Sequence, residues 1–416
     1  MGTMQENKLN VKKTLLLSFG FFASSIAWSV YNSFVPQILE SFITSTTLIG
    51  FIMTIDNIFG VIFQPIFGKL SDKTRTRFGR RMPYIFVGLP ICAVAFTLVP
   101  RMNSLPSLMA VLIIFTFVMS AWRSPVVALM PDITPGPLRS QANGIVNLMG
   151  GVGSLIAFFA GGILFKAGGF PLPFFMSAVM MIVALLVMAL FVREPKEAYG
   201  SIDENNKKSD VKLTKNEMKS LLLILFGVFF WFTGYNAVET FFTLYATNTL
   251  GMDAGSAAMT LSVFSLTFLA FAVPAGFIGA KIGRRRAILI GLIGIIILFL
   301  PMIFVANAWV TRICLFLAGF FWALININSL PMVVRLSGDD KVGTYIGYYY
   351  FFSFSSQIVS PILFGFIRDM IGHYRVLFLY ACIAFALAGI SLFFVRHGEE
   401  GKDKADAMEA LNALDD

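Results

Sequence analysis

Charged residues are scarce in this chain of 416 residues: Asp, Glu, Lys and Arg make up 13% of it, whereas hydrophobic residues make up 57%. A soluble protein of this length needs a larger charged surface, so the composition excludes a soluble globular protein and indicates that lipid covers the apolar surface. The net charge is +9. We attribute this excess to orientation in a membrane and expect no nucleic-acid partner.

Cysteine and histidine are also rare, with three and two residues. Cys92, Cys314 and Cys382 show no metal-ligand spacing, and His373 and His397 lie outside the apolar segments. We therefore expect no metal site, no disulfide framework, no cofactor and no enzyme activity. The phosphate-binding pattern Gly-x4-Gly-Lys-Ser/Thr is missing, so ATP is not expected to drive the protein directly.

Twelve apolar segments fill the chain instead, and each is long enough to cross a hydrocarbon layer of ~30 Å. They predict an all-α integral membrane protein with twelve transmembrane helices. The predicted spans are 14–37, 46–68, 82–100, 106–131, 141–165, 170–192, 219–248, 255–279, 286–305, 309–334, 342–367 and 374–395.

The basic residues are distributed unevenly between the junctions. All Lys and Arg residues lie in the amino terminus, the even-numbered junctions or the carboxyl tail, apart from Arg101, Arg123, Lys166, Arg312, Arg368 and Arg375. Because basic residues stay on the cytoplasmic side, we predict that both termini are cytoplasmic and that the protein lies in a plasma membrane, the inner membrane of a bacterium.

The second half of the chain repeats patterns of the first. Tyr31-Asn32 matches Tyr235-Asn236, and Gly144 matches Gly347. Such matches predict two six-helix bundles, inserted the same way round and related by a pseudo-twofold axis. The predicted organisation is an N-terminal bundle (1–192), a cytoplasmic linker (193–218), a C-terminal bundle (219–396) and a cytoplasmic tail (397–416).

The junction after the second span carries a family resemblance. Gly68-Lys69-Leu70-Ser71-Asp72-Lys73, followed by Gly79-Arg80-Arg81, resembles the signature of the major facilitator superfamily. Its longer form, from Gln64 to Gly68 and from Ser71 to Pro83, is similar to that of proton-coupled sucrose transporters and the related glycoside-pentoside-hexuronide:cation symporters. Pro125 to Asp132 with Arg139 to Gly144 adds a second similarity. The resemblance implies the major facilitator fold and symport of a sugar or glycoside with a cation by alternating access.

Two departures refine this expectation. Sodium-coupled members have paired aspartates on the second helix, where this chain has Gln64 and a single Asp56, so a proton is the expected coupling cation. Sucrose carriers have an arginine just after the proline that corresponds to Pro125, whereas Arg123 precedes it here. The resemblance therefore does not identify the sugar.

Asp56, Arg123 and Glu239 are the ionisable residues deep inside predicted spans, where each costs roughly 2.5 to 3.5 kcal/mol if it faces lipid. Counted from the cytoplasmic ends, Asp56 and Arg123 could meet near the midplane. Two interpretations stay open: a fixed ion pair between the second and fourth helices, or a carboxylate that takes up a proton when the pair separates. Glu239 is interpreted as a residue of a cavity wall or gate.

Gly68, Asp72, Arg80 and Arg81 are the predicted conformational latch. The resemblance implies that Asp72 faces the start of the eleventh helix, near Gly343 and Thr344. A carboxylate at a helix N-terminus contributes ~0.3 to 1 kcal/mol, which is enough to bias an equilibrium between two states. The second half has Ala280 at the corresponding position, so this latch is expected in one half only.

A sugar needs hydrogen-bonding side chains and an aromatic face, and the predicted spans offer both. The candidate substrate-binding residues are Tyr31, Asn32, Trp122, Asn147, Tyr235, Asn236, Trp322, Asn326 and Gln357, with Asn328 and Tyr349 as further candidates.

The leading hypothesis is therefore a monomeric, proton-coupled carrier that moves a small sugar or glycoside across a lipid bilayer. Its main alternative is a proton-coupled exporter of a drug or metabolite, because exporters share the junction signature. A sensor or a lipid scramblase that transports no solute belongs to a different class. A sensor normally adds a sizeable soluble domain, for which neither the linker nor the tail has room.

Overall fold

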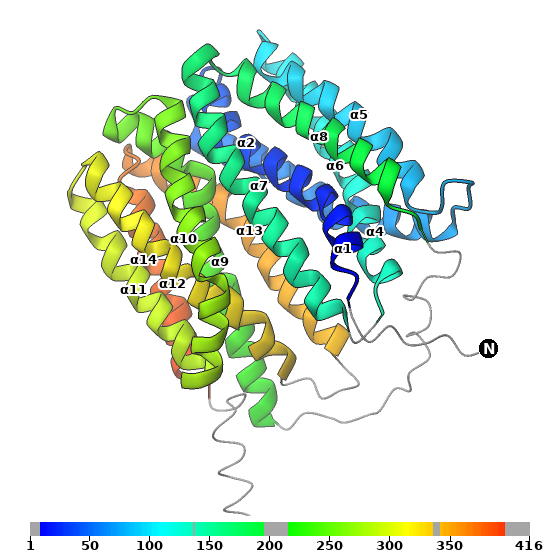
Figure 1. Ribbon diagram of the computed structural model, residues 1–416. Coiled ribbons are helices and arrows are strands. Elements are labelled where there is room, and N and C mark those ends of the chain that lie inside the picture. Colours follow the sequence, from blue (N-terminus) through cyan, green and yellow to red (C-terminus); the bar gives the residue numbers. More distant parts are fainter. Residues whose placement is uncertain (1–8, 136–137, 195–214, 336–341, 396–416) are drawn as a thin grey trace, which may run out of the picture. The chain divides into compact units, whose positions relative to one another are not determined.

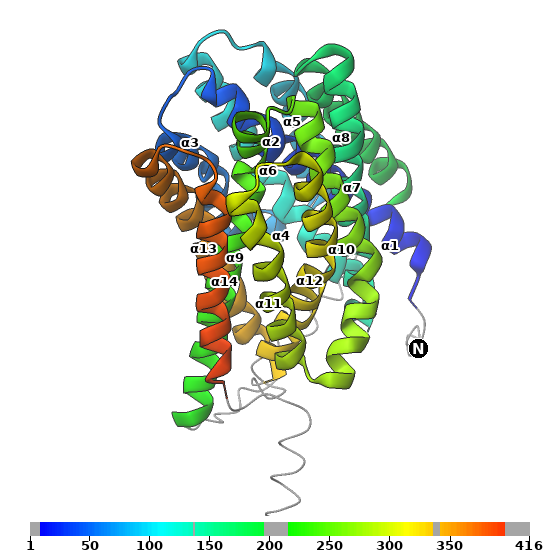
Figure 2. The same cartoon turned by 90° about the vertical axis from the view of Figure 1, so that its left-hand side faces the viewer.

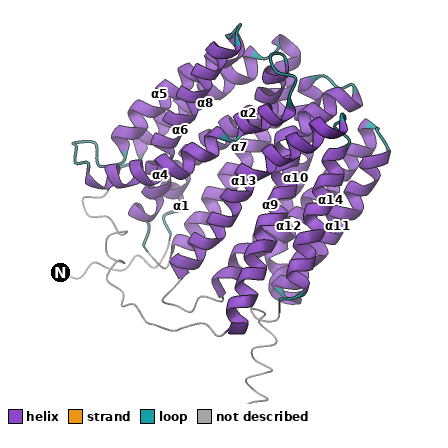
Figure 3. Ribbon diagram, turned by 180° about the vertical axis from the view of Figure 1, so that it is seen from behind, coloured by secondary structure: helices purple, strands orange, loops and turns teal. Residues whose placement is uncertain are grey.

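The computed structural model describes residues 9–135, 138–194, 215–335 and 342–395, and every regular element within them is a helix (Figure 3). The β pairing found in these residues is one isolated bridge between Thr76 and Gly79, in a loop. Helices are expected because each backbone amide inside lipid needs a partner within its own segment. The predicted linker lies mostly, and the predicted tail wholly, outside the described residues.

The helices follow one another with short connections. They are α1 (Val11–Leu17), α2 (Phe19–Glu40), α3 (Thr46–Met53), α4 (Ile55–Lys73), α5 (Met82–Leu98), the 3-10 turn η1 (Val99–Arg101), α6 (Leu105–Ile133), α7 (Arg139–Gly168), α8 (Pro171–Phe191), α9 (Lys215–Leu250), α10 (Ala254–Ile282), α11 (Arg284–Phe304), α12 (Ala308–Arg335), α13 (Val342–Ile371) and α14 (Val376–Phe393).

In the described part of the chain, twelve helical segments are long and apolar enough to cross a membrane. The predicted twelve-span, all-helical fold is thus confirmed. Each of the first two spans consists of two helices. The second span breaks at Thr54, between α3 and α4, where the threonine hydroxyl donates to the carbonyl of Phe51 at 2.8 Å. Such a bond competes with the regular helical ladder, and the break lies two residues before Asp56.

The chain gathers into two compact units. Unit 1 comprises Met1–Asn206 and Met252–Ser262, and unit 2 comprises Lys207–Gly251 and Val263–Asp416. Within unit 1, α2 packs against α7 and α8, and α5 packs against α6 and α8 (Figure 1). Within unit 2, α9 packs against α13 and α14, and α11 packs against α12 and α14 (Figure 2). Equivalent spans thus meet equivalent neighbours, as a duplicated bundle requires.

Candidate functional site

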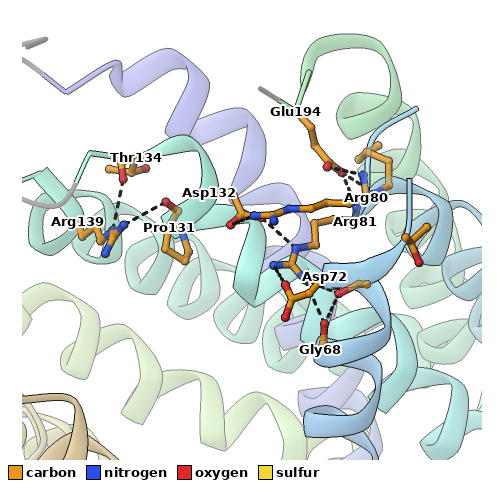
Figure 4. A network of polar contacts seen from close by, with 12 residues as sticks. Gly68, Asp72, Arg80, Arg81, Pro131, Asp132, Thr134, Arg139 and Glu194 are labelled. Atoms are coloured by element: carbon orange, nitrogen blue, oxygen red, sulfur yellow. Dashed lines mark hydrogen bonds and ion pairs between the residues drawn. The ribbon is translucent and has the colours of Figure 1, made fainter. Parts of the chain in front are cut away.

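Four charged side chains meet at one end of unit 1, where α4 ends, α5 begins and α6 ends (Figure 4). Arg80 Nη2 lies 2.5 Å from Asp132 Oδ1, and Arg81 Nε lies 2.9 Å from Asp132 Oδ2. Arg81 also pairs with Asp72. The side chains of Arg81 and Asp132 are 5% and 6% exposed, whereas that of Asp72 is 54% exposed. A buried guanidinium thus joins an interior carboxylate to a surface one.

The local sequence explains how Arg81 reaches this position. The loop from α4 to α5 turns at Gly79, whose φ of 109° favours glycine, and Thr76 closes the turn by donating its hydroxyl to the Gly79 carbonyl at 2.7 Å. Arg81 then donates to the carbonyl of Gly68 at 3.3 Å and to the hydroxyl of Ser71. The structure thus brings together the predicted latch residues Gly68, Asp72, Arg80 and Arg81, while their role in gating stays a prediction.

Glu194, just after the end of α8, completes this group (Figure 4). Its carboxylate accepts hydrogen bonds from the backbone N–H groups of Arg80, Arg81 and Met82 at 2.7, 2.8 and 2.7 Å. Amides at the start of a helix have no partner within the helix, and the helix dipole favours an anion there. Glu194 therefore ties the end of α8 to the start of α5. We call Asp72, Arg80, Arg81, Asp132 and Glu194 the loop cluster.

Replacing Glu194 with alanine should lower the free energy of unfolding by ~1–2 kcal/mol, the usual cost of a lost N-terminal cap. The measurement is thermal melting of the purified protein. Arg193→Ala is the matched control, because Arg193 is the exposed neighbour. Equal melting temperatures for the two variants would show that the cap contributes nothing.

The sequence alone did not identify Asp132 and Glu194 as members of this cluster. Both follow predicted spans, and both lie at even-numbered junctions, on the same side as Arg80 and Arg81. A search for acidic residues on the side that carries the basic ones would have found them, because a buried arginine needs carboxylate partners.

Asp56 lies inside unit 1, partly buried and close enough to Tyr31 of α2 for the two to interact electrostatically. Tyr31 is 1% exposed, and its ring stacks on that of Phe115 at 6.0 Å between centroids. Its hydroxyl has no hydrogen-bond partner among the described residues. A phenol of this kind can donate to a carboxylate or to a ligand.

Arg123, the predicted partner of Asp56, lies on α6, which packs against α4. The hydroxyl of Ser124 donates to the carbonyl of Gln64 at 2.7 Å, which sets the register of these two helices. By this register, Arg123 is about seven residues, or ~10 Å, along α4 from Asp56. An extended arginine side chain is needed to cover that distance, so their ion pair stays a prediction.

The other candidates of unit 1 lie in different surroundings. Trp122 is fully buried, packs against Gly88 and donates its indole N–H to the sulfur of Cys92 at 3.3 Å. It therefore fills the space between α5 and α6, and we leave it out of the proposed site. Asn147 is exposed on α7, and Asn32 is partly buried on α2.

In unit 2, two predicted residues are in direct contact. Tyr235 of α9 and Trp322 of α12 stack with 4.3 Å between ring centroids and 6° between planes. Asn236 is buried and donates to the hydroxyl of Ser356 at 3.2 Å, which ties α9 to α13. Asn326 and Gln357 are partly buried. Of the further candidates, Asn328 donates to carbonyls of α10 and α12, and Tyr349 shares a hydrogen bond with Ser329.

The junction after α10 contains Ala280 where the first half has Asp72, and its arginine has another role. Arg285 donates to the carbonyl groups of Leu392 and Phe393 at 2.9 and 2.6 Å. These carbonyls lie at the end of α14, where a cation is favoured by the helix dipole. The guanidinium here satisfies a helix end instead of joining carboxylates.

A sequence model of the Major Facilitator Superfamily matches residues 17–262 and 224–414, which together cover most of the chain. The chain belongs to the Major Facilitator Superfamily. The solved structures that this superfamily member resembles include a bacterial homologue of the human lysosomal transporter Spinster, with a TM-score of 0.69, 14% identity and coverage of 92% of this chain and 93% of that one. The nucleoside transporter NupG gives a TM-score of 0.70 at 12% identity, with coverage of 92% and 98%.

Curated proteins similar to this superfamily member have names that refer to drug resistance. The tetracycline resistance protein, class H, of Pasteurella multocida is 24% identical over 380 residues, which cover 86% of this chain and 90% of that protein. Multidrug resistance protein 2 of Bacillus subtilis is 25% identical over 385 residues, which cover 90% of this chain and 93% of that protein. The fold and the membrane-transport class of the chain follow from these matches.

Proposed function

We propose that this superfamily member is a secondary active exporter, which exchanges a drug or metabolite for protons by alternating access. The observation that carries the proposal is the similarity, over most of their length, to proteins named for tetracycline and multidrug resistance. A transporter gives resistance when it removes the drug from the cell. The proposal is supported by carboxylates within spans, since such costly residues are retained for proton or substrate pathways. Asp56 is the proposed coupling carboxylate.

The loop cluster is the proposed conformational latch of this exporter. If basic residues mark the cytoplasmic side, both termini and the loop cluster lie in the cytoplasm. Asp72 is its most exposed acid, with 54% of the side chain accessible, and is therefore the member best placed to exchange partners between states. A preference of ~0.3 to 1 kcal/mol for one state is enough to shift the resting population.

Symport of a sugar or glycoside is the second candidate. The observation that favours it is the long form of the junction signature, from Gln64 to Gly68 and from Ser71 to Pro83. The same transport assay separates the two candidates, because they differ in substrate and in the direction of the proton gradient that drives accumulation.

The test is transport by the full-length protein in liposomes at a clamped membrane potential. Tetracycline, a panel of lipophilic drugs and a panel of labelled glycosides are offered under inward and outward proton gradients. For an exporter, at least one drug accumulates when the interior is acidic, and no glycoside does. Accumulation of a glycoside together with protons would replace the exporter by the symporter.

A further inference from the structure

Unit 2 contains a group of aromatic rings around the stacked pair Tyr235 and Trp322. Phe232 meets Trp322 edge-on, with 5.8 Å between centroids and 83° between planes, and Phe264 lies tilted beside Tyr235 at 6.2 Å. Trp322 is 3% exposed, whereas Tyr235 and Phe232 are partly exposed. Trp322 therefore backs the ring of Tyr235, and Tyr235 offers the accessible surface.

A carboxylate stands at the edge of these rings. Glu239 is one helical turn after Tyr235 on α9, is partly exposed, and shares a side-chain hydrogen bond with the phenol of Tyr235. A phenol O–H that donates to a carboxylate stabilises the charged form and fixes its position. The result is a negative group held beside an aromatic surface inside a membrane span.

The repeat shows that the fold does not require this acid. The Tyr-Asn pair of unit 2 corresponds to Tyr31-Asn32 in unit 1, and the residue that corresponds to Glu239 is Val35. Val35 is fully buried, and Tyr31 stacks on Phe115. An aliphatic residue thus suffices for packing at the equivalent place, and the carboxylate of Glu239 needs another explanation.

We propose that Glu239 and Tyr235 bind the positively charged group of a lipophilic organic cation, with Trp322 as the residue that positions Tyr235. This inference rests on the proposed export function and names the class of substrate. The faces of tyrosine and tryptophan attract cations, and a nearby carboxylate adds charge pairing, which is stronger away from water. An organic cation fits better than a metal ion, because no group of three His, Cys, Asp or Glu residues occurs in the part of the chain that the structure describes.

Binding of labelled tetraphenylphosphonium to the purified full-length protein tests this site. Triphenylphosphine oxide is a neutral probe with related phenyl rings and shows what the charge contributes. Glu239→Gln should weaken binding of the cation about tenfold or more, which corresponds to ~1.4 kcal/mol, and should leave binding of the neutral probe unchanged. Asp253→Asn, which removes a partly exposed carboxylate outside the site, should bind both probes as the wild type does.

Two further variants make the result independent of folding defects. Glu239→Asp keeps the charge and should retain binding of the cation within a few-fold. Tyr235→Phe keeps the ring, removes the hydrogen bond to Glu239 and should weaken binding of the cation alone. Equal affinity of wild type and Glu239→Gln for the cation, or equal losses for both probes, would overturn the proposal.

The transport assay separates this inference from the proposed function. If drugs are exported but the wild type does not bind tetraphenylphosphonium, the cation site is wrong and the export function stands. If no compound of the drug panel moves under any gradient, the export function fails, and binding of tetraphenylphosphonium that depends on Glu239 would then still support the cation site.

Discussion

Asp56→Asn should abolish accumulation of substrate driven by a proton gradient while leaving exchange of substrate across the membrane intact. The amide resembles the protonated acid in size but cannot release or bind a proton at neutral pH. A carrier with this change can still alternate between its two states with substrate bound. It has lost the group that makes one of the states depend on protons.

The size of the effect follows from the driving force. One pH unit is worth ~1.4 kcal/mol per proton, so a carrier that exchanges one proton per substrate reaches about a tenfold concentration ratio across a gradient of one unit. For Asp56→Asn this ratio should fall to about one. The measurement is the steady-state ratio in liposomes at a clamped membrane potential. Asp56→Glu, which keeps an ionisable group, is the control and should retain a ratio well above one.

Glu239→Gln provides a second comparison, because the proposed roles of the two acids differ. A weakened substrate site raises the substrate concentration needed for half-maximal transport but leaves the steady-state ratio unchanged, since that ratio depends on coupling alone. Accumulation of about tenfold by Asp56→Asn would contradict the coupling role. Asp56 would then be a structural residue of the span that breaks at Thr54.

The fold could be predicted because lipid leaves few alternatives. Long apolar runs have to be helices, and their number and the matching Tyr-Asn pairs give the duplicated arrangement. The break at Thr54 was not predicted. It depends on a hydroxyl that bonds to its own backbone, which leaves the hydropathy of the span unchanged.

The candidate site was predicted only where a local motif carries it. Gly68, Asp72 and Arg81 lie within fourteen residues of one another, whereas Asp132 and Glu194 reach Arg81 from 51 and 113 residues away. The side chains inside the spans were harder to assign, because a sequence does not show how each helix is rotated. Trp122 thus looked equivalent to Trp322, yet it lies in the core of unit 1.

The substrate class was the least accessible to sequence reasoning. The resemblance to sugar symporters rests largely on the loop from Ser71 to Pro83, and the contacts of this loop hold helix ends together. Residues that hold helix ends respond to the need for gating, which importers and exporters share. Side chains in the spans, such as Glu239 and Tyr235, are those that a substrate can select.

Arg81→Leu should be among the most destabilising single substitutions in the described part of unit 1. The side chain is 5% exposed and contacts Asp72, Asp132, Ser71 and the carbonyl of Gly68. Removal of one partner from a buried ion pair costs ~3–5 kcal/mol, because it leaves an uncompensated charge inside the protein. Arg80 remains beside Asp132, so we expect a loss of about 3 kcal/mol, near the lower end of this range.

Thermal melting or equilibrium unfolding of the purified protein measures this loss. Arg77→Leu is the matched control, because Arg77 is exposed and lies over the ring of Phe78, so its replacement should change stability by less than ~0.5 kcal/mol. Asp72→Ala should also cost little, ~0–1 kcal/mol, since its carboxylate is half exposed. It should nevertheless raise the accessibility of cytoplasmic thiol probes, because the proposed latch is weakened.

A double substitution then separates the ion pair from the rest of the loop cluster. Asp132→Asn removes the buried negative charge, so Arg81→Leu in that background should cost less than it does alone, and the difference is the coupling energy of Arg81 with Asp132. Arg81→Lys keeps the charge but lacks the planar fork that serves both carboxylates, and should recover less than half of the lost stability. Additive losses in the double variant, or full recovery with lysine, would mean that burial of the side chain, rather than its paired geometry, stabilises this end of unit 1.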